Sequence, residues 1–145
     1  DLKQALYDQF GQSLEFKKVR SKEEMVEEVQ HVSPDTHTFG LIQEDELLVG
    51  TLSHPVATLA VGSLQPLLDR LVKSGQTASI DYVHGEETVF SLGNQAGNAG
   101  IFLPALAKDD LFRTVILEGA LPRKTFSMGE AHEKRFYMEA RKIVP

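Results

Sequence analysis

Ionisable side chains gather in residues 81–87, which read Asp-Tyr-Val-His-Gly-Glu-Glu. Because histidine titrates near neutral pH, His84 could transfer protons or ligate a cation, with Asp81 or Glu86 as its partner. Gly85 would let the backbone turn sharply or approach a ligand closely. No metal-binding spacing such as His-Glu-x-x-His is present, so His84, Asp81 and Glu86 are candidate catalytic residues rather than a metal site. The alternative is that His84 lies in a turn and that the glutamates begin a helix, where acidic residues are favourable.

A second polar segment, residues 121–129, combines two cations with hydroxyl groups. Arg123 and Lys124 could hold a phosphate or a carboxylate, and the Thr125 hydroxyl could donate a further hydrogen bond. If this segment meets the histidine-containing one, together they would bind a small anionic ligand, such as a phosphorylated metabolite or a nucleotide. The ligand-binding candidates are then Gly85, Arg123, Lys124 and Thr125. The alternative is an exposed loop that precedes the last strand.

The composition excludes several classes of protein. The 145 residues suffice for one domain with its own core, and no apolar run approaches the ~20 residues of a membrane span. The absence of cysteine excludes thiol nucleophiles, cysteine-bound zinc and iron–sulfur clusters, and it fits a reducing cytoplasm. Nothing identifies a cofactor or a metal.

The charge is unevenly distributed along the chain. The formal net charge of −6 disfavours nucleic-acid binding. Residues 121–145 carry +3, so the rest of the chain carries −9. One interpretation is an anion-facing end in an acidic chain, and the other is a solvated strand with charges on its outer face.

The first half of the chain contains strong local signals. A helix over residues 2–10 is predicted with Asp1 as its cap and Gly11 as its end, followed by a short strand. Ser21 and Glu24 form a capping box that opens a second helix. Residues 38–43 and 47–53 are apolar runs joined by three acidic residues, which predicts a β-hairpin.

The second half begins with the clearest helix. Its apolar residues recur at core-facing spacing, with Ser63 as the cap, Pro66 in the first turn and Gly75 at the end. A strand over residues 78–83 would place His84 beyond its carboxyl end, where ligands of open α/β sheets commonly bind. The remaining predictions are a short helix near 86–91, a connecting loop over 93–100, a short strand over 101–103, a helix opened by Asp109 and Asp110, and a long final strand over 134–143.

This interleaving of strands and helices predicts one domain over residues 1–145. We expect a mixed β-sheet with one hairpin, covered by helices, in an α/β or α+β fold. The strand order does not follow from the sequence.

Three segments of the chain resemble the uncharacterised bacterial and archaeal family called domain of unknown function 1015. Its members carry a similar Asp-Tyr-x-His-Gly segment, an apolar strand ending near proline, and a Met-Pro-x-Lys-Ser-Thr-like segment. Residues 81–87, 101–104 and 121–125 correspond to these, whereas residues 126–130 depart from the family's aromatic-Pro-Lys continuation. The resemblance implies a cytoplasmic protein of which this chain is the C-terminal part, and it implies no activity. The start at Asp1 rather than at Met fits this expectation.

Two functions remain open at this point. The first is a binding domain, with or without catalysis, for the small anionic ligand described above. The second is a structural or protein-interaction domain without its own active site, packed against the rest of a longer parent chain or against a second copy. Nucleic-acid binding through the basic end is a weaker third hypothesis.

Overall fold

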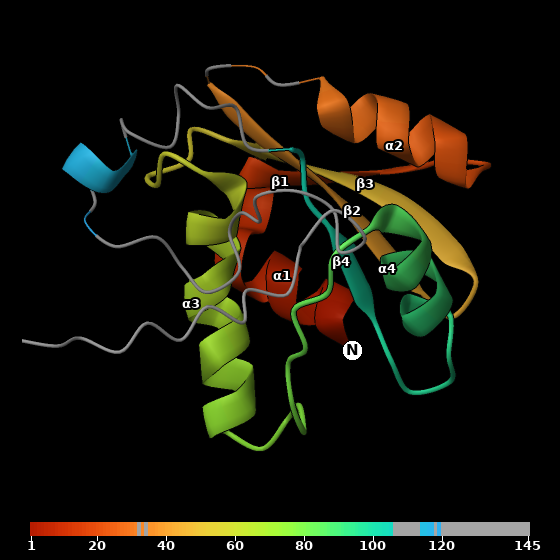
Figure 1. The fold of residues 1–145 in the computed structure, drawn as a ribbon. Helices are drawn as coiled ribbons and strands as arrows, with labels where there is room; N and C mark the ends of the chain where they lie inside the picture. Colours follow the sequence, from red (N-terminus) through yellow and green to blue (C-terminus); the bar gives the residue numbers. More distant parts are fainter. Residues whose placement is uncertain (32, 34, 106–113, 118, 120–145) are drawn as a thin grey trace, which may run out of the picture.

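The structure is a computed structural model and describes residues 1–31, 33, 35–105, 114–117 and 119. None of the described helices is both long and apolar enough to cross a membrane. Figure 1 shows the fold. Its elements are the helix α1 (Leu2–Phe10), the 3-10 helix η1 (Gly11–Ser13), the strand β1 (Leu14–Lys18), α2 (Lys22–Gln30), β2 (Thr36–Gln43), β3 (Glu46–Ser53), α3 (Ala60–Lys73), α4 (Glu86–Gly93) and β4 (Gly100–Phe102).

The four strands form one sheet in the order β1-β3-β2-β4, and each neighbouring pair is antiparallel. β2 and β3 form the predicted hairpin, in which Gln43 pairs with Glu46. The turn holds only Glu44 and Asp45, whose φ angles of 50° and 65° are those of a type I′ turn. The connection is one residue shorter than predicted, because Glu46 belongs to β3.

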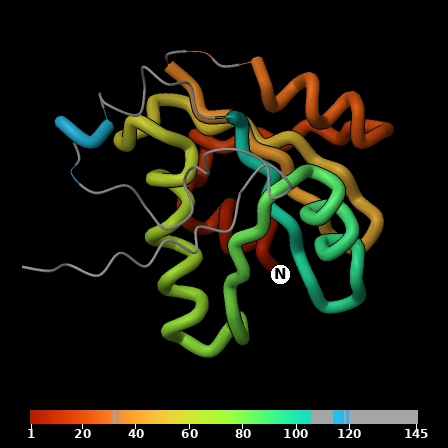
Figure 2. The backbone as a smooth tube through the Cα atoms, in the orientation of Figure 1, coloured from red at the N-terminus to blue at the C-terminus, as the bar shows by residue number. Residues whose placement is uncertain are grey.

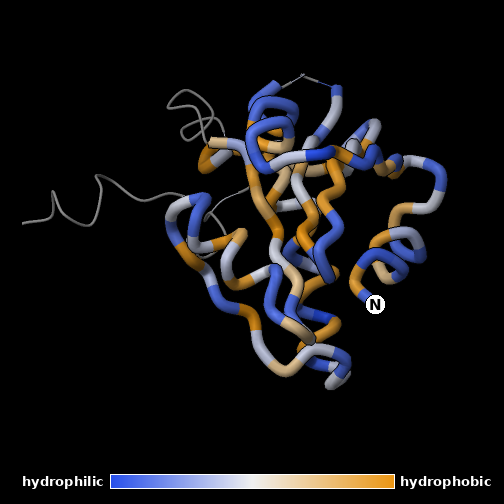
Figure 3. Tube along the Cα trace, turned by 90° about the vertical axis from the view of Figure 1, so that its right-hand side faces the viewer, coloured by the Kyte–Doolittle hydropathy of each residue, from blue (hydrophilic) through white to orange (hydrophobic). Residues whose placement is uncertain are grey.

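Side chains alternate between the two faces of the sheet, and helices cover both faces (Figure 1). The first face packs against α1 and α3, with Phe39 of β2 buried beside Leu6 and Leu64. The second face packs against α2 and α4, with Ile42 of β2 buried beside Met25. In Figure 3 the hydrophobic segments gather in the central strands, whereas hydrophilic residues mark the outer turns of the helices. The sheet is therefore the middle layer of three.

Of the two fold classes that the sequence left open, the structure shows α+β. A single domain contains an antiparallel sheet packed with helices. We expected a mixed sheet, but no parallel pair occurs among the strands of the described residues.

The helix α3 starts earlier than the sequence predicts. Its first residue is Ala60, and its N-cap, Leu59, makes no side-chain capping bond. Ser63, the predicted cap, therefore lies inside the helix, and so does Pro66. The prediction was wrong because a helix start without a capping side chain leaves no signal, whereas Ser63 and Pro66 match the usual pattern of a helix start.

The strand predicted over residues 78–83 is absent. Gly75 ends α3 as predicted, with φ at 74°, and the Gln76 N–H then donates to the Leu71 carbonyl in a Schellman motif. Beyond this point, residues 78–83 have no regular secondary structure and no backbone hydrogen bond to another described residue. The segment has strand-like residues without a neighbouring strand, and an isolated strand is not stable by itself.

Several predicted elements can now be compared with the structure. The helices at both ends of β1, the short helix after Gly85 and the strand before Pro104 are confirmed. The helix opened by Asp109 and Asp110 is described only over residues 114–117, which are helical. The final strand over 134–143 lies outside the described residues.

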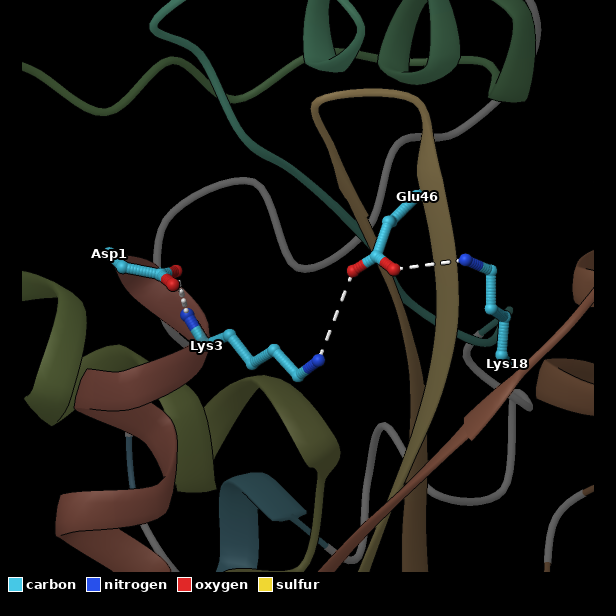
Figure 4. Close-up of polar contacts among 4 residues, drawn as sticks. All are labelled: Asp1, Lys3, Lys18 and Glu46. Atoms are coloured by element: carbon cyan, nitrogen blue, oxygen red, sulfur yellow. Dashed lines mark hydrogen bonds and ion pairs between the residues drawn. The ribbon is translucent and has the colours of Figure 1, made fainter.

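The Glu46 carboxylate lies between two lysines beside the hairpin turn (Figure 4). Lys18 Nζ donates to Glu46 Oε1 at 2.9 Å, and Lys3 Nζ lies 3.9 Å from Oε2. The hydrogen bond from Lys18 is the main cause that lowers the pKa of Glu46, and the positive charge of Lys3 adds to it. These contacts join α1, β1 and β3 on the first face of the sheet.

We expect Glu46→Gln to reduce the loss of thermal stability in acid. Because the folded-state pKa is lowered, ionised Glu46 contributes stability above the ordinary glutamate pKa, and this is lost as pH falls through the folded-state pKa. The effect is small because the pair is exposed to solvent. Unfolding midpoints between about pH 7 and about pH 3 should fall less in the variant than in the wild type. Lys18→Met should show the same reduced loss of thermal stability in acid as Glu46→Gln. Glu15→Gln, on the second face, should lose as much thermal stability as the wild type. An equal fall of the unfolding midpoint with pH in all four proteins would contradict the assignment of this effect to the Lys18–Glu46 pair.

Candidate functional site

A groove of about 1360 Å³ runs along the β4 edge of the molecule. Leu64 and Leu68 of α3 line one part of it, and Ile101 and Leu103 line another. The connection from α3 to α4, residues 76–85, also lines the groove, and Figure 2 shows it passing from one helix to the other. The groove lining therefore includes apolar side chains of α3 and β4 together with one irregular segment.

The charged side chains of this groove are acidic. Its described lining contains the carboxylates of Asp1, Glu44, Asp81 and Glu86 but no lysine or arginine. Two histidines, one of them His84, also line it. At neutral pH the described lining therefore carries negative charge, which favours a cationic rather than an anionic ligand.

The other histidine of the groove, His37, connects β2 to the start of α3. Its Nε2 lies 3.2 Å from the Thr58 carbonyl oxygen, which can only accept, so Nε2 carries the proton in this contact. In the neutral ring Nδ1 then accepts from the Ser63 hydroxyl, at 3.0 Å. His37 is half-buried. No local pattern predicts this contact, because His37 and Ser63 are 26 residues apart.

A serine next to a histidine can also be a nucleophile with its base. Here His37 and Thr58 line the groove, whereas Ser63 is not among its lining residues. The pair therefore links β2 to α3. The contact with His37 occupies the Ser63 hydroxyl, which is then not available as a cap.

A side-chain hydrogen bond joins the irregular connection to α3. Gln65 Nε2 donates to the Tyr82 hydroxyl at 2.6 Å and to Asp69 Oδ1 at 2.8 Å. Gln65 lines the groove, and its Oε1 atom is buried without a hydrogen-bond partner. A buried acceptor without a donor is unusual in proteins.

The structure brings part of the predicted site together. Asp81, His84, Gly85 and Glu86 all line the groove, although no strand positions them. Gly85 has a φ of 91° and is the N-cap of α4, so the predicted need for glycine at this turn is confirmed. Asp81, His84 and Glu86 are exposed. The ligand-binding candidates Arg123, Lys124 and Thr125 lie outside the described residues.

Glu86 forms an ion pair with Lys22 of α2 and also lines the groove. Lys22 Nζ of α2 lies 3.4 Å from Glu86 Oε1 and also contacts the Glu87 carboxylate. The hydrogen bond to Glu87 is the main cause that raises the pKa of Lys22. The same ammonium lies 5.4 Å from the centre of the Phe90 ring. These contacts hold α2 against α4 and agree with the alternative that the two glutamates begin a helix.

No group of three or more histidine, aspartate or glutamate side chains in the described part of the chain could hold a metal ion. Comparison with known proteins gave no match: no family model, no curated protein and no solved structure is similar to this chain. The resemblance to the domain of unknown function 1015 therefore stays a prediction.

Proposed function

We propose that this protein is an interaction domain whose groove binds an extended, cationic segment of a partner polypeptide. The observation that carries the proposal is the outer edge of β4, beside the groove, which is unpaired in the described part of the chain. β4 pairs only with β2, so its outer edge has no ladder partner among the described residues. Such an edge is a template for a further strand, and many domains bind peptides by strand addition.

The side chains around the groove indicate which segment would fit. A bound strand would place every second side chain towards Leu68, Ile101 and Leu103, so apolar residues are expected at alternate positions. The carboxylates of Asp81 and Glu86 would attract lysine or arginine at the remaining positions.

A small anionic ligand remains the second candidate and rests on Arg123, Lys124 and Thr125. The described lining adds no lysine or arginine to hold such a ligand. A thermal shift induced by a nucleotide or a sugar phosphate, and lost in both His84→Ala and Lys124→Ala, would favour this candidate.

A fluorescent peptide of about ten residues tests the interaction. In the first peptide lysine alternates with valine, and in the matched control glutamate alternates with valine. We expect the lysine peptide to bind the full chain more tightly, as measured by fluorescence anisotropy, and to weaken as salt is added. Asp81→Asn should weaken binding about twofold to fivefold, since it removes one exposed charge pair. Asp45→Asn, in the hairpin turn, is the control and should bind like the wild type.

Two outcomes would overturn the proposal. One is equal binding of the lysine and glutamate peptides, because the groove would then have no charge preference. The other is an equal effect of Asp81→Asn and Asp45→Asn, because the peptide would then bind away from the groove.

A further inference from the structure

The sheet ends in β1 on the side away from β4, and the outer edge of β1 is also unpaired in the described part of the chain. We propose that this edge pairs with β1 of a second copy, antiparallel and with Phe16 opposite Phe16, to form a dimer with two-fold symmetry. The inference goes beyond the proposed function, because it uses the other edge of the sheet and does not involve the groove.

The hydrogen bonds between β1 and β3 show which residues of β1 point to the open edge. The Val19 N–H, directly after β1, donates to the Leu47 carbonyl of β3 at 3.0 Å. In an antiparallel ladder, pairs that exchange hydrogen bonds alternate with pairs that do not, so every second residue before Val19 also bonds to β3. The residues between them have N–H and C=O groups that point outwards: Leu14, Phe16 and Lys18.

These outward groups are complementary to those of a second copy. With Phe16 opposite Phe16, the two phenylalanines exchange two hydrogen bonds, and the Lys18 N–H of each copy donates to the Leu14 carbonyl of the other. The Leu14 N–H already donates to the Gly11 carbonyl and is not needed. The register of β1 with β3 contains no bulge, and β1 contains no proline, so neither of these devices blocks the edge.

The charged side chains of the second face select this register. Glu15 then lies directly opposite Lys17 of the second copy, in a pair without ladder bonds, where the Cα atoms are only about 4.5 Å apart. By symmetry this pair occurs twice. A shift by two residues would place Glu15 opposite Glu15 or Lys17 opposite Lys17, and like charges directly opposite each other destabilise a sheet. A shift by one residue would set outward backbone groups against inward ones.

Both charges are accessible for this contact. Glu15 is exposed, and its carboxylate forms no ion pair with another residue of the described part. Lys17 contacts Glu28 of α2, but its side chain is 60% exposed and its ammonium has three N–H donors. Lys17 can therefore bond to Glu28 and to Glu15 of a second copy at the same time.

Aromatic side chains lie at the same place on the first face. Phe16 packs edge-on against Tyr7 of α1, with ring centroids 5.2 Å apart, and Tyr7 is 37% exposed. In the dimer the two Phe16 residues are cross-strand neighbours, and aromatic pairs are favourable at such positions. Because β1 has only five residues, the interface is short, and we expect the dimer to dissociate on dilution.

Charge reversal in the full chain tests the dimer, with sedimentation velocity over a series of concentrations as the measurement. Lys17→Glu and Glu15→Lys should each raise the dissociation constant at least about fivefold, because each replaces two attractive pairs by two repulsive ones. An equimolar mixture of the two variants should dimerise like the wild type, because opposite charges then meet again. Lys73→Glu, the same change of charge on α3, is the matched control and should leave the dissociation constant unchanged.

Disulfides test the register, because the chain has no cysteine of its own. A protein with Glu15→Cys is mixed with a size-tagged protein with Lys17→Cys. A disulfide needs Cα atoms within about 7 Å, which directly opposite residues satisfy. We expect the mixed disulfide to exceed each disulfide between identical variants at least about fivefold.

Four outcomes would overturn the inference. The first is a wild-type chain that stays monomeric at every concentration. The second is a dimer that the two charge reversals weaken no more than Lys73→Glu does, because another surface would then join the copies. The third is a mixture of the two charge variants that stays monomeric although circular dichroism shows both to be folded. The fourth is disulfide formation without a preference for the mixed pair.

Discussion

Phe39→Ala is expected to lower the free energy of unfolding by about 3–5 kcal/mol, the usual cost of removing a buried phenylalanine side chain. Phe39 is 1% exposed and lies on the first face of the sheet, among the residues that α1 and α3 cover. Its ring packs edge-on against Phe16, with ring centroids 6.0 Å apart. Because domains of this size are stable by only about 5–15 kcal/mol, the variant should lose roughly a fifth or more of its stability.

Urea unfolding followed by circular dichroism measures this change. Val56→Ala is the control, because Val56 is fully exposed, at 104%, and its truncation should change the stability by less than about 0.5 kcal/mol. Similar losses in the two variants would show that Phe39 does not lie in the main core.

The parts of the fold that were predicted correctly depend on contacts between near neighbours in the sequence. The Ser21 hydroxyl accepts from the Glu24 N–H at 3.2 Å, as a capping box requires. Gly75 ends α3 through bonds to residues three to five positions away. The hairpin turn needs only two residues with positive φ. Each of these signals is complete within a few residues, so the sequence alone is enough to recognise it.

The errors concern contacts between distant parts of the chain. Residues 78–83 have the composition of a strand, but pairing requires a neighbour that local sequence does not specify. Ser63 has the properties of a cap, but His37, from another element, binds its hydroxyl. In both cases the outcome depends on contacts with distant parts of the chain, which local sequence does not specify.

The candidate site likewise has features that local sequence predicts and features that depend on contacts between distant parts of the chain. Local composition correctly indicated that residues 81–86 are polar and turn sharply at Gly85, and the structure places them along a groove. The groove itself depends on α3 and β4, so neither its apolar lining nor its acidic character could be predicted. The Lys22 contact of Glu86 joins residues 64 positions apart and was likewise invisible in the sequence.

Gly50→Ala is expected to lower the free energy of unfolding by about 1–3 kcal/mol, the usual cost of overpacking a core. Gly50 of β3 stands opposite Phe16 on β1 and opposite Phe39 on β2. A Cβ atom at this position would lie 2.6 Å from Cζ of Phe39 and 2.9 Å from Cε1 of Phe16, so the rings would have to move. Alanine also restricts the unfolded chain, which offsets part of this cost.

A double-mutant cycle with Phe39→Leu shows whether the rings fix glycine at this position. Leucine removes the ring atoms nearest to the new methyl group, so Gly50→Ala should cost less in the Phe39→Leu background than in the wild type. The expected coupling is about 0.5–3 kcal/mol, as for residues in direct contact. Urea unfolding of the four proteins gives each stability. The same cost in both backgrounds would mean that Gly50 is required for the backbone and not for the packing of its two aromatic neighbours.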